Sequence, residues 1–210
     1  MADANSTFEA REHWESVYRR RSERDVSWFQ PHAATSLRLI RRSGLGREEP
    51  LIDVGAGASV LVDELLQAGF RDVTVLDISD AAEQRARERL GAEAARVTWL
   101  VGDVTTFQAE RSYALWHDRA LFHFMTSADQ RTGYVRALHA ALRPGGQAII
   151  ATFAIGGPRR CSGLDIVQYD APGLLAELGP AFALEEQLDE EHVTPSGGTQ
   201  LFSYFRLRRR

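Results

Sequence analysis

Apolar runs of strand length alternate with amphipathic stretches along the central part of the chain. The runs are rich in aliphatic and β-branched residues, and they occupy residues 51–54, 73–77, 97–101, 113–117 and 148–153. Several stretches between them place apolar residues at helical spacing, and Ser79 and Ser127 stand where helix caps are expected. This alternation predicts a mostly parallel sheet that is covered by helices on both faces.

Helical patterns precede the first of these runs. Ser6 and Glu9 have the spacing of a capping box, and apolar residues then recur at helical spacing to about Arg20. A second helical stretch ends near Gly44. The N-terminal segment is therefore expected to be helical.

The C-terminal part predicts a different arrangement. Residues 143–146 contain proline and two glycines, which end the preceding helix. A short helix capped by Asp170 is followed by strand-like segments at residues 182–193 and 201–205. Only a turn separates these two segments, so they must pair antiparallel. The whole pattern predicts a three-layer α/β sandwich, with a mostly parallel seven-stranded sheet ending in an antiparallel C-terminal hairpin.

Composition and charge exclude several classes of protein. Hydrophobic residues make up 44% of the 210 residues and charged residues 26%, which is ordinary globular usage. The net charge of −4 argues against a nucleic-acid partner. The C-terminal arginines Arg206, Arg208, Arg209 and Arg210 are expected to form a solvated basic tail rather than an anion site.

The cellular setting is also constrained. A single cysteine rules out an intrachain disulfide and favours a reducing compartment. No apolar run approaches the roughly 20 residues that span a bilayer. We therefore expect a cytoplasmic protein without a membrane partner. The histidines share no metal-ligand spacing, so no metal is expected.

A glycine pair and an acidic residue indicate a nucleoside site. Gly55 and Gly57 directly follow the first predicted strand, where ligands of doubly wound sheets bind. Asp77 ends the next strand about 20 residues later, the spacing at which a carboxylate accepts both ribose hydroxyls. Val60 takes the place of the third glycine of a dinucleotide motif, and Asp53 would repel a pyrophosphate. An acid there suits the positively charged methionine end of a methyl donor.

Residues 51–57, Leu-Ile-Asp-Val-Gly-Ala-Gly, resemble the first motif of the class I S-adenosylmethionine-dependent methyltransferases. Asp77, Gly102-Asp103 and residues 142–146 resemble the later motifs, in the family's order. One departure is Ser59, where many relatives have a further glycine, although a serine can cap the following helix. The resemblance implies S-adenosylmethionine as cofactor and S-adenosylhomocysteine as product.

The resemblance also implies a role for each matching residue. Gly55, Ala56 and Gly57 would lie beneath the methionine part, and Asp53 would hold its amino group. Asp77 would take the ribose hydroxyls. The adenine would lie among a further set of residues: Ile78, Gly102, Asp103 and Val104.

The resemblance divides the single domain, residues 1–210, into three parts. Residues 1–45 would be a helical lid, residues 50–155 the cofactor-binding core, and residues 156–210 the substrate-side loop, helix and hairpin. Trp14 and Trp28 would belong to the lid and Trp28 would reach the cofactor, although Trp14 is equally explained as an anchor of the first helix.

His117 and Asp118 end the fourth predicted strand, where they would face the donor and the acceptor. His117 is the first candidate for a catalytic base, because its ordinary pKa is near 6.5, and Asp118 is the second. The alternatives are a packed imidazole whose main chain serves the cofactor, and an ion pair between Asp118 and Arg119. His123, among apolar neighbours, is expected to be a packed histidine.

The loop after the fifth strand supplies candidates for acceptor binding. Arg159 and Arg160 directly precede Cys161 and would bind an anionic acceptor together with Arg119, and they would lower the thiol's pKa. The alternative is an incidental cysteine in a flexible basic loop.

Three functions remain open. The first is methyl transfer to a sulfur, oxygen or nitrogen atom of a small molecule, because the lid and the loop would enclose a modest pocket. The second is protein-lysine methylation: residues 13–18 and 26–29 resemble the first segment of a branch that includes eukaryotic lysine methyltransferases. Residues 116–119, Trp-His-Asp-Arg, match that branch's Asp-Lys-Gly-Thr only at Asp118. The third is a non-catalytic cofactor binder or a nucleotide-dependent oxidoreductase.

Overall fold

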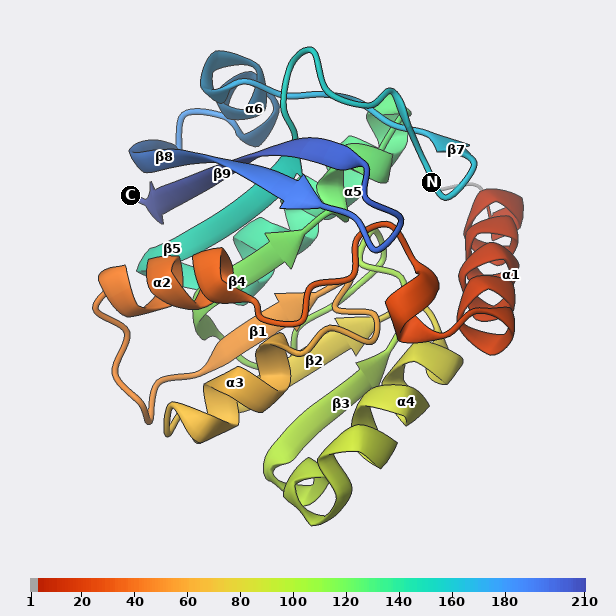
Figure 1. Ribbon diagram of the computed structural model, residues 1–210. Coiled ribbons are helices and arrows are strands. Elements are labelled where there is room, and N and C mark those ends of the chain that lie inside the picture. The colour runs from red at the N-terminus through yellow and green to blue at the C-terminus, as the bar shows by residue number, and fades with distance from the viewer. Residues whose placement is uncertain (1–3) are drawn as a thin grey trace.

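A seven-stranded sheet forms the centre of the computed structural model, which describes residues 4–210 (Figure 1). The strand order is β3-β2-β1-β4-β5-β9-β8. The strands are β1 Leu51–Val54, β2 Val73–Asp77, β3 Val97–Val101, β4 Tyr113–Arg119, β5 Leu142–Phe153, β8 Phe182–Val193 and β9 Thr199–Arg209. Strands β1 to β5 pair in parallel, whereas β9 is antiparallel to both β5 and β8. The predicted sheet and its terminal hairpin are confirmed.

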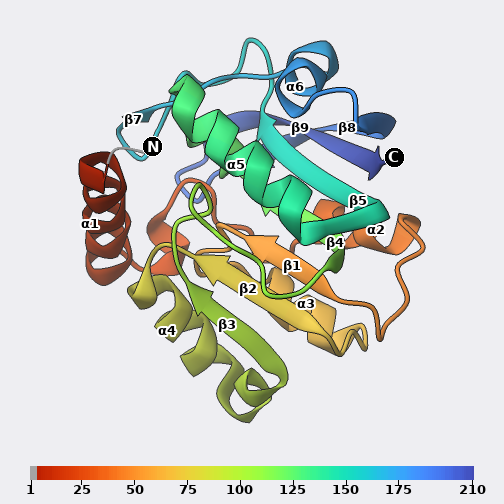
Figure 2. The ribbon, with the colours of Figure 1, turned by 180° about the vertical axis from the view of Figure 1, so that it is seen from behind.

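Helices cover both faces of this sheet (Figures 1 and 2). They are α1 Ala4–Arg20, α2 Ala34–Arg42, α3 Leu61–Gln67, α4 Asp80–Leu90, α5 Ala128–Ala141 and α6 Ala171–Leu178, with 3₁₀ turns η1 Glu23–Asp25, η2 Gly91–Arg96 and η3 Phe122–Phe124. One buried cluster joins the sheet to α2 and α3, and a second joins its other face to α5 and α6. None of the helices described here is long and apolar enough to cross a bilayer.

Local capping signals place most helix starts correctly. The Ser79 hydroxyl accepts from the Ala82 amide at 3.2 Å, Asp170 accepts from Gly173, and Ser127 and Gln130 form the predicted capping box. The predicted start of the first helix is wrong, because α1 already includes Ala4 and its backbone passes Ser6 within the helix.

Two predicted strand boundaries are also wrong. Helix α5 ends before the proline and glycines of residues 143–146, but those residues then belong to a long β5 that starts at Leu142. Strand β4 continues to Arg119, which puts Asp118 and Arg119 on the strand. In both cases pairing with the neighbouring strand extends the element beyond its apolar run.

The loop after β5 contains a small hairpin. Strand β6, Arg160–Cys161, pairs antiparallel with β7, Leu164–Asp165. Ser162 in its turn adopts a positive φ of 51°. This hairpin lies near α1 at the edge of the molecule (Figure 1).

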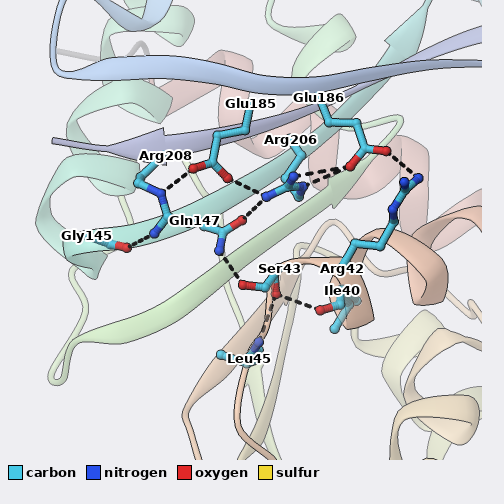
Figure 3. A network of polar contacts seen from close by, with 10 residues as sticks. All are labelled: Ile40, Arg42, Ser43, Leu45, Gly145, Gln147, Glu185, Glu186, Arg206 and Arg208. Atoms are coloured by element: carbon cyan, nitrogen blue, oxygen red, sulfur yellow. Dashed lines mark hydrogen bonds and ion pairs between the residues drawn. The ribbon is translucent and has the colours of Figure 1, made fainter.

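The C-terminal arginines do not form a solvated tail, which corrects the sequence interpretation. Three of them lie on β9 and Arg210 directly follows it. Arg206 pairs with Glu185 and Glu186, and Arg208 pairs with Glu185 (Figure 3). Arg206 also donates to the Gln147 side chain at 2.7 Å, and Gln147 donates to the Ser43 carbonyl at 2.6 Å. The acidic residues come from β8, so only the hairpin register brings the charges together. The network ties β9 to β5 and α2.

This network predicts unequal costs for its two arginines. The Arg206 side chain is 13% exposed and that of Arg208 is 45% exposed. Arg206→Met leaves two part-buried carboxylates with less compensation, so we expect the free energy of unfolding in urea to fall by roughly 2 kcal/mol. Arg208→Met is the matched control and is expected to cost less than about 1 kcal/mol. Equal losses would show that burial of the network contributes nothing.

Candidate functional site

A cavity of about 810 Å³ lies at the carboxyl ends of the central strands. Its floor comes from residues that end or follow β1, β2, β3 and β4, which is the edge where the glycine pair was predicted to bind a ligand. Its walls and roof come from α1, the segment around η1, η3 and the β6–β7 hairpin. The predicted lid segment therefore does line the site.

Asp77 holds the glycine loop against β2. Its carboxylate accepts from the Gly57 amide at 2.7 Å and from the Ser79 amide at 2.8 Å. Burial, with a smaller contribution from the nearby Asp53 carboxylate, raises the pKa of Asp77 to about 6 against the effect of the amide donors. The side chain lines the cavity, so the carboxylate that shapes the loop also faces the ligand space.

The two glycines are required by close approaches. Gly57 has a φ of +57°, and a Cβ there would meet the Tyr18 hydroxyl at 2.1 Å. Gly55 has a φ of +61°, and a Cβ there would lie 2.7 Å from the Leu121 Cβ. Both the left-handed backbone and the lack of space exclude a side chain. The Ser59 hydroxyl accepts from the Leu61 amide at 3.1 Å, but Val60 occupies the N-cap position of α3, so Ser59 supports the first turn from one residue before the cap.

His117 lies in a buried chain of hydrogen bonds. Its Nδ1 is 2.6 Å from Asp53 Oδ1, and its Nε2 is 2.9 Å from the Ser36 hydroxyl of α2. Asp53 and His117 are register partners on β1 and β4, and both line the cavity. Because both ring nitrogens have partners within the protein, the imidazole has no nitrogen left for the acceptor's proton in this arrangement. Sequence reasoning missed Ser36, which carried no local signal.

Asp118 points away from the cavity. Alternation along β4 puts it on the opposite face from His117, where it is completely buried. It accepts from the amides of Leu121 and Phe122 and from the Tyr134 hydroxyl at 2.7 Å. Burial raises its pKa to about 7, against the effect of these donors. The carboxylate therefore fixes the turn after β4 and has no access to an acceptor, and it does not pair with Arg119.

The expected adenine-binding residues lie together at one end of the cavity. Ile78, Gly102, Asp103 and Val104 all line it, at the ends of β2 and β3. Asp103 accepts from the Thr105 amide and hydroxyl, each at 2.8 Å, which fixes its carboxylate beside the Val104 backbone.

Aromatic residues build the roof. The Trp14 ring makes edge contacts with Trp28 at 5.7 Å and with Phe124 at 5.1 Å between centroids. The Glu15 carboxylate accepts from the amides of Asp80 and Ala81, which fixes α1 to the positive end of α4. Trp14 thus anchors the helix and lines the cavity at once, so the two alternatives for it are compatible.

Arg119 lies on the inner wall of the cavity. Its guanidinium donates to the Tyr204 hydroxyl at 2.9 Å and to the Trp28 carbonyl at 3.0 Å. It stacks over the Phe202 ring at 4.6 Å, and its remaining nitrogen is 4.0 Å from a Glu190 oxygen. The Arg119 guanidinium therefore links β4 to β9 and to the lid segment.

Cys161 on the β6–β7 hairpin has a different environment from the one expected. The thiol is buried and lines the cavity, and burial raises its pKa to about 11, although Ser27 and Arg119 act in the opposite direction. The expected lowering by neighbouring arginines is wrong. Arg160 pairs with Asp165, and Arg159 is exposed and lies outside the cavity lining.

Two further findings concern His123 and the side chains that could bind a metal. His123 is fully buried, and burial lowers its pKa to about 3, which confirms a packed, neutral imidazole. Within residues 4–210, no group of three or more His, Cys, Asp or Glu side chains has a metal-binding arrangement.

Tyr18 is a site residue that the sequence interpretation left without a role. It is buried over Gly57, and it lies one helical turn after Trp14 on the same face of α1. That spacing is the signal that would have placed it at the cavity.

The residues fit the donor that the sequence implies. The glycine loop brings main chain to the cavity floor at Gly55, the buried Asp77 carboxylate suits a diol, and Asp103 beside the Val104 backbone suits an adenine edge.

Comparisons with known proteins find methyltransferases. Residues 51–146 match the family described as a methyltransferase domain. The chain is 29% identical over 134 residues to the eEF1A lysine and N-terminal methyltransferase of Xenopus laevis, covering 63% of this chain and 19% of that protein. It is 32% identical over 147 residues to methyltransferase gedG of Aspergillus terreus, covering 70% and 42%. The chain thus spans about a fifth and less than half of these relatives.

Solved structures share the fold. The 1,6-didemethyltoxoflavin-N1-methyltransferase of Burkholderia thailandensis, solved with 1,6-didemethyltoxoflavin and S-adenosylhomocysteine, superposes with a TM-score of 0.72 at 23% identity. The superposition covers 100% of this chain and 92% of that one.

Gly57→Ala tests the close approach of α1 to the glycine loop. Gly44 also has a positive φ, of +75°, with no atom within 4 Å of an added Cβ, so Gly44→Ala measures the cost of a positive φ alone, about 1–2 kcal/mol. We expect Gly57→Ala to cost at least about 1 kcal/mol more in urea unfolding, because Tyr18 must move. Introducing Tyr18→Phe first should reduce that difference. Equal costs for the two glycines would contradict the packing described.

Proposed function

We propose that this chain, which carries a class I S-adenosylmethionine-dependent methyltransferase domain, transfers the donor's methyl group to a small-molecule acceptor. The acceptor atom would be a sulfur, an oxygen or a nitrogen, and it would displace the sulfur in line. The observation that carries the proposal is the roofed cavity of about 810 Å³ beside the cofactor motifs. Pockets for small molecules measure about 300–1,000 Å³.

The donor is assigned to the end of the cavity near β2 and β3. Asp77 would accept the ribose hydroxyls, and the adenine would lie between Ile78 and Asp103. The methionine part would pass over Gly55 and Ala56, which line the cavity, whereas Gly57 lies beneath Tyr18 and outside the lining. Asp53 is buried near Asp77, and two neighbouring carboxylates favour a positively charged ligand.

The protein's contribution is alignment and exclusion of water. The sulfonium supplies the electrophilic carbon, so the side chains need only hold the two reactants in line. The aromatic residues Trp14, Trp28 and Phe124 line the cavity and would exclude water from the reacting atoms. The acceptor would lie between this roof, the β6–β7 hairpin at Cys161 and the guanidinium of Arg119. Exposed Arg159 has no part in this proposal.

Protein-lysine methylation is the second candidate. The eEF1A methyltransferases among the relatives favour it, and the acidic residues Glu9, Asp129 and Asp165 line the same cavity. Against it, the roof over the cavity differs from the open acidic groove that a protein substrate requires. Methylation of a lysine peptide but of no small thiol, phenol or amine would favour this candidate over the first.

Calorimetric titration tests the cofactor assignment. We expect S-adenosylmethionine and S-adenosylhomocysteine to bind and NAD not to bind. Asp77→Ala removes the acceptor of two ribose hydroxyls and should weaken binding at least about a hundredfold. Asp72→Ala, just before β2 and paired with Arg111, is the matched control and should bind normally.

Binding of NAD alone would contradict the proposal and point to redox chemistry. Binding of the donor with no methyl transfer to any acceptor class would instead indicate a cofactor-binding protein without catalysis.

The pH dependence of binding tests the ionisation of Asp77. Its pKa is raised to about 6 by burial, and the ionised form is the one that accepts two hydroxyls. Affinity for S-adenosylhomocysteine should therefore be constant above the pKa and should fall as pH drops through it. About one pH unit below the pKa, the loss should be roughly tenfold. Asp77→Asn should bind more weakly and remove this component of the pH dependence. A wild-type component that persists unchanged in Asp77→Asn would assign the titration to another group.

A further inference from the structure

We propose that His13 on α1 is the general base of the reaction, and that the acceptor's nucleophilic atom arrives protonated, as a hydroxyl or a thiol. This inference rests on the proposed methyl transfer and adds to it the proton acceptor and the chemical class of the substrate.

The histidines near the cavity differ in how many of their ring nitrogens are hydrogen bonded. Among the described residues, the histidines that line the cavity are His13 and His117. His117 has both ring nitrogens engaged by Asp53 and Ser36, whereas His13 has one contact, between Nε2 and the Ser162 hydroxyl at 3.3 Å. In residues 4–210 no hydrogen-bond partner is found for its Nδ1. His13 therefore retains a ring nitrogen for proton uptake.

The His13 ring lies where an acceptor would bind. His13 projects from the roof helix and contacts the turn of the β6–β7 hairpin, so it bridges the two elements that would enclose the acceptor. The Trp14 ring holds it by an edge contact at 5.1 Å. Ser162 reaches it from a left-handed turn position, a conformation that non-glycine residues adopt rarely. Both sides of the ring are thus fixed by neighbouring residues.

Burial and one neighbouring charge favour the neutral imidazole of His13. Glu9 lies one turn earlier on α1, and Arg21 directly follows that helix. On the hairpin, Asp165 and Cys161 line the same cavity. Asp165 pairs with Arg160, and burial keeps the Cys161 thiol protonated, so neither adds a free charge. Burial and then the Arg21 charge lower the pKa of His13 below 6.5. At neutral pH the ring therefore has a lone pair available.

The step balances without any further reactant. The lone pair of the acceptor oxygen or sulfur forms a bond to the methyl carbon, the carbon–sulfur bond of the donor breaks, and its electron pair returns to sulfur. The proton of the acceptor passes to His13 Nδ1, which leaves an imidazolium and a neutral methyl ether or thioether. The imidazolium then loses its proton to water when the site opens.

A matched set of acceptors tests this role. Phenol and 2-phenylethanethiol are protonated at neutral pH, whereas pentafluorophenol and 4-nitrothiophenol are ionised. His13→Gln should lower kcat with the protonated pair by about 10²–10⁴-fold and leave the ionised pair nearly unchanged. The wild-type kcat/KM should rise with pH through a pKa below 6.5, and the variant should lack that limb. His32→Gln, an exposed histidine paired with Glu64, is the control.

A second measurement does not depend on turnover. The imidazole resonance of His13, identified by its loss in His13→Gln, should titrate below pH 6.5 and shift in Ser162→Ala. Unchanged turnover of the protonated acceptors by His13→Gln, or an ordinary titration of His13, would overturn the role of base. Methylation of none of the four acceptors would overturn the substrate class. Failure of S-adenosylhomocysteine to bind the wild-type protein would instead overturn the proposed function itself.

Discussion

Three buried carboxylates at the carboxyl ends of adjacent strands constrain this fold. Asp77 is the last residue of β2, Asp53 and Asp118 are the second-last residues of β1 and β4, and each is less than a tenth exposed. A buried carboxylate is costly unless donors compensate it. Here the donors are the amides of the glycine loop, a histidine, and the amides of the turn after β4. The conformation of all three loops therefore follows from the need to pair these charges, and the cavity is the space that those loops leave open.

The three buried carboxylates differ in whether they face the ligand space. Asp53 and Asp77 line the cavity, whereas Asp118 lies on the other face, so a charged ligand meets two of the three carboxylates. The roof is then added by α1, which Glu15 fixes to α4 and Tyr18 fixes over the glycine loop. The arginine network joins the beginning of β8 to the end of β9 and stabilises the hairpin (Figure 3). None of its residues lines the cavity.

Local signals in the sequence predict the elements and the motif positions, because a cap, a glycine turn or an apolar run acts within a few residues. The residues between Asp53 and Val104 that are expected to bind the cofactor could be located at this edge of the sheet for that reason. The hydrogen-bond and ion-pair partners of these residues could not be predicted from local signals. The bond from His117 to Ser36 joins residues 81 positions apart, and the partners of Arg206 depend on the hairpin register. The burial that raises the pKa of Cys161 likewise comes from packing that the neighbouring arginines do not reveal.

A crystal structure of the complex with S-adenosylhomocysteine tests the central claim most directly. The account predicts the nucleoside in the roofed cavity, with both ribose hydroxyls on the Asp77 carboxylate and the adenine amino group on Asp103. It also predicts that the sulfur faces an empty space bounded by His13, Trp14 and the β6–β7 hairpin. A nucleoside bound elsewhere, or turned so that its sulfur faces away from that space, would contradict the assignment of both the donor and the acceptor sites.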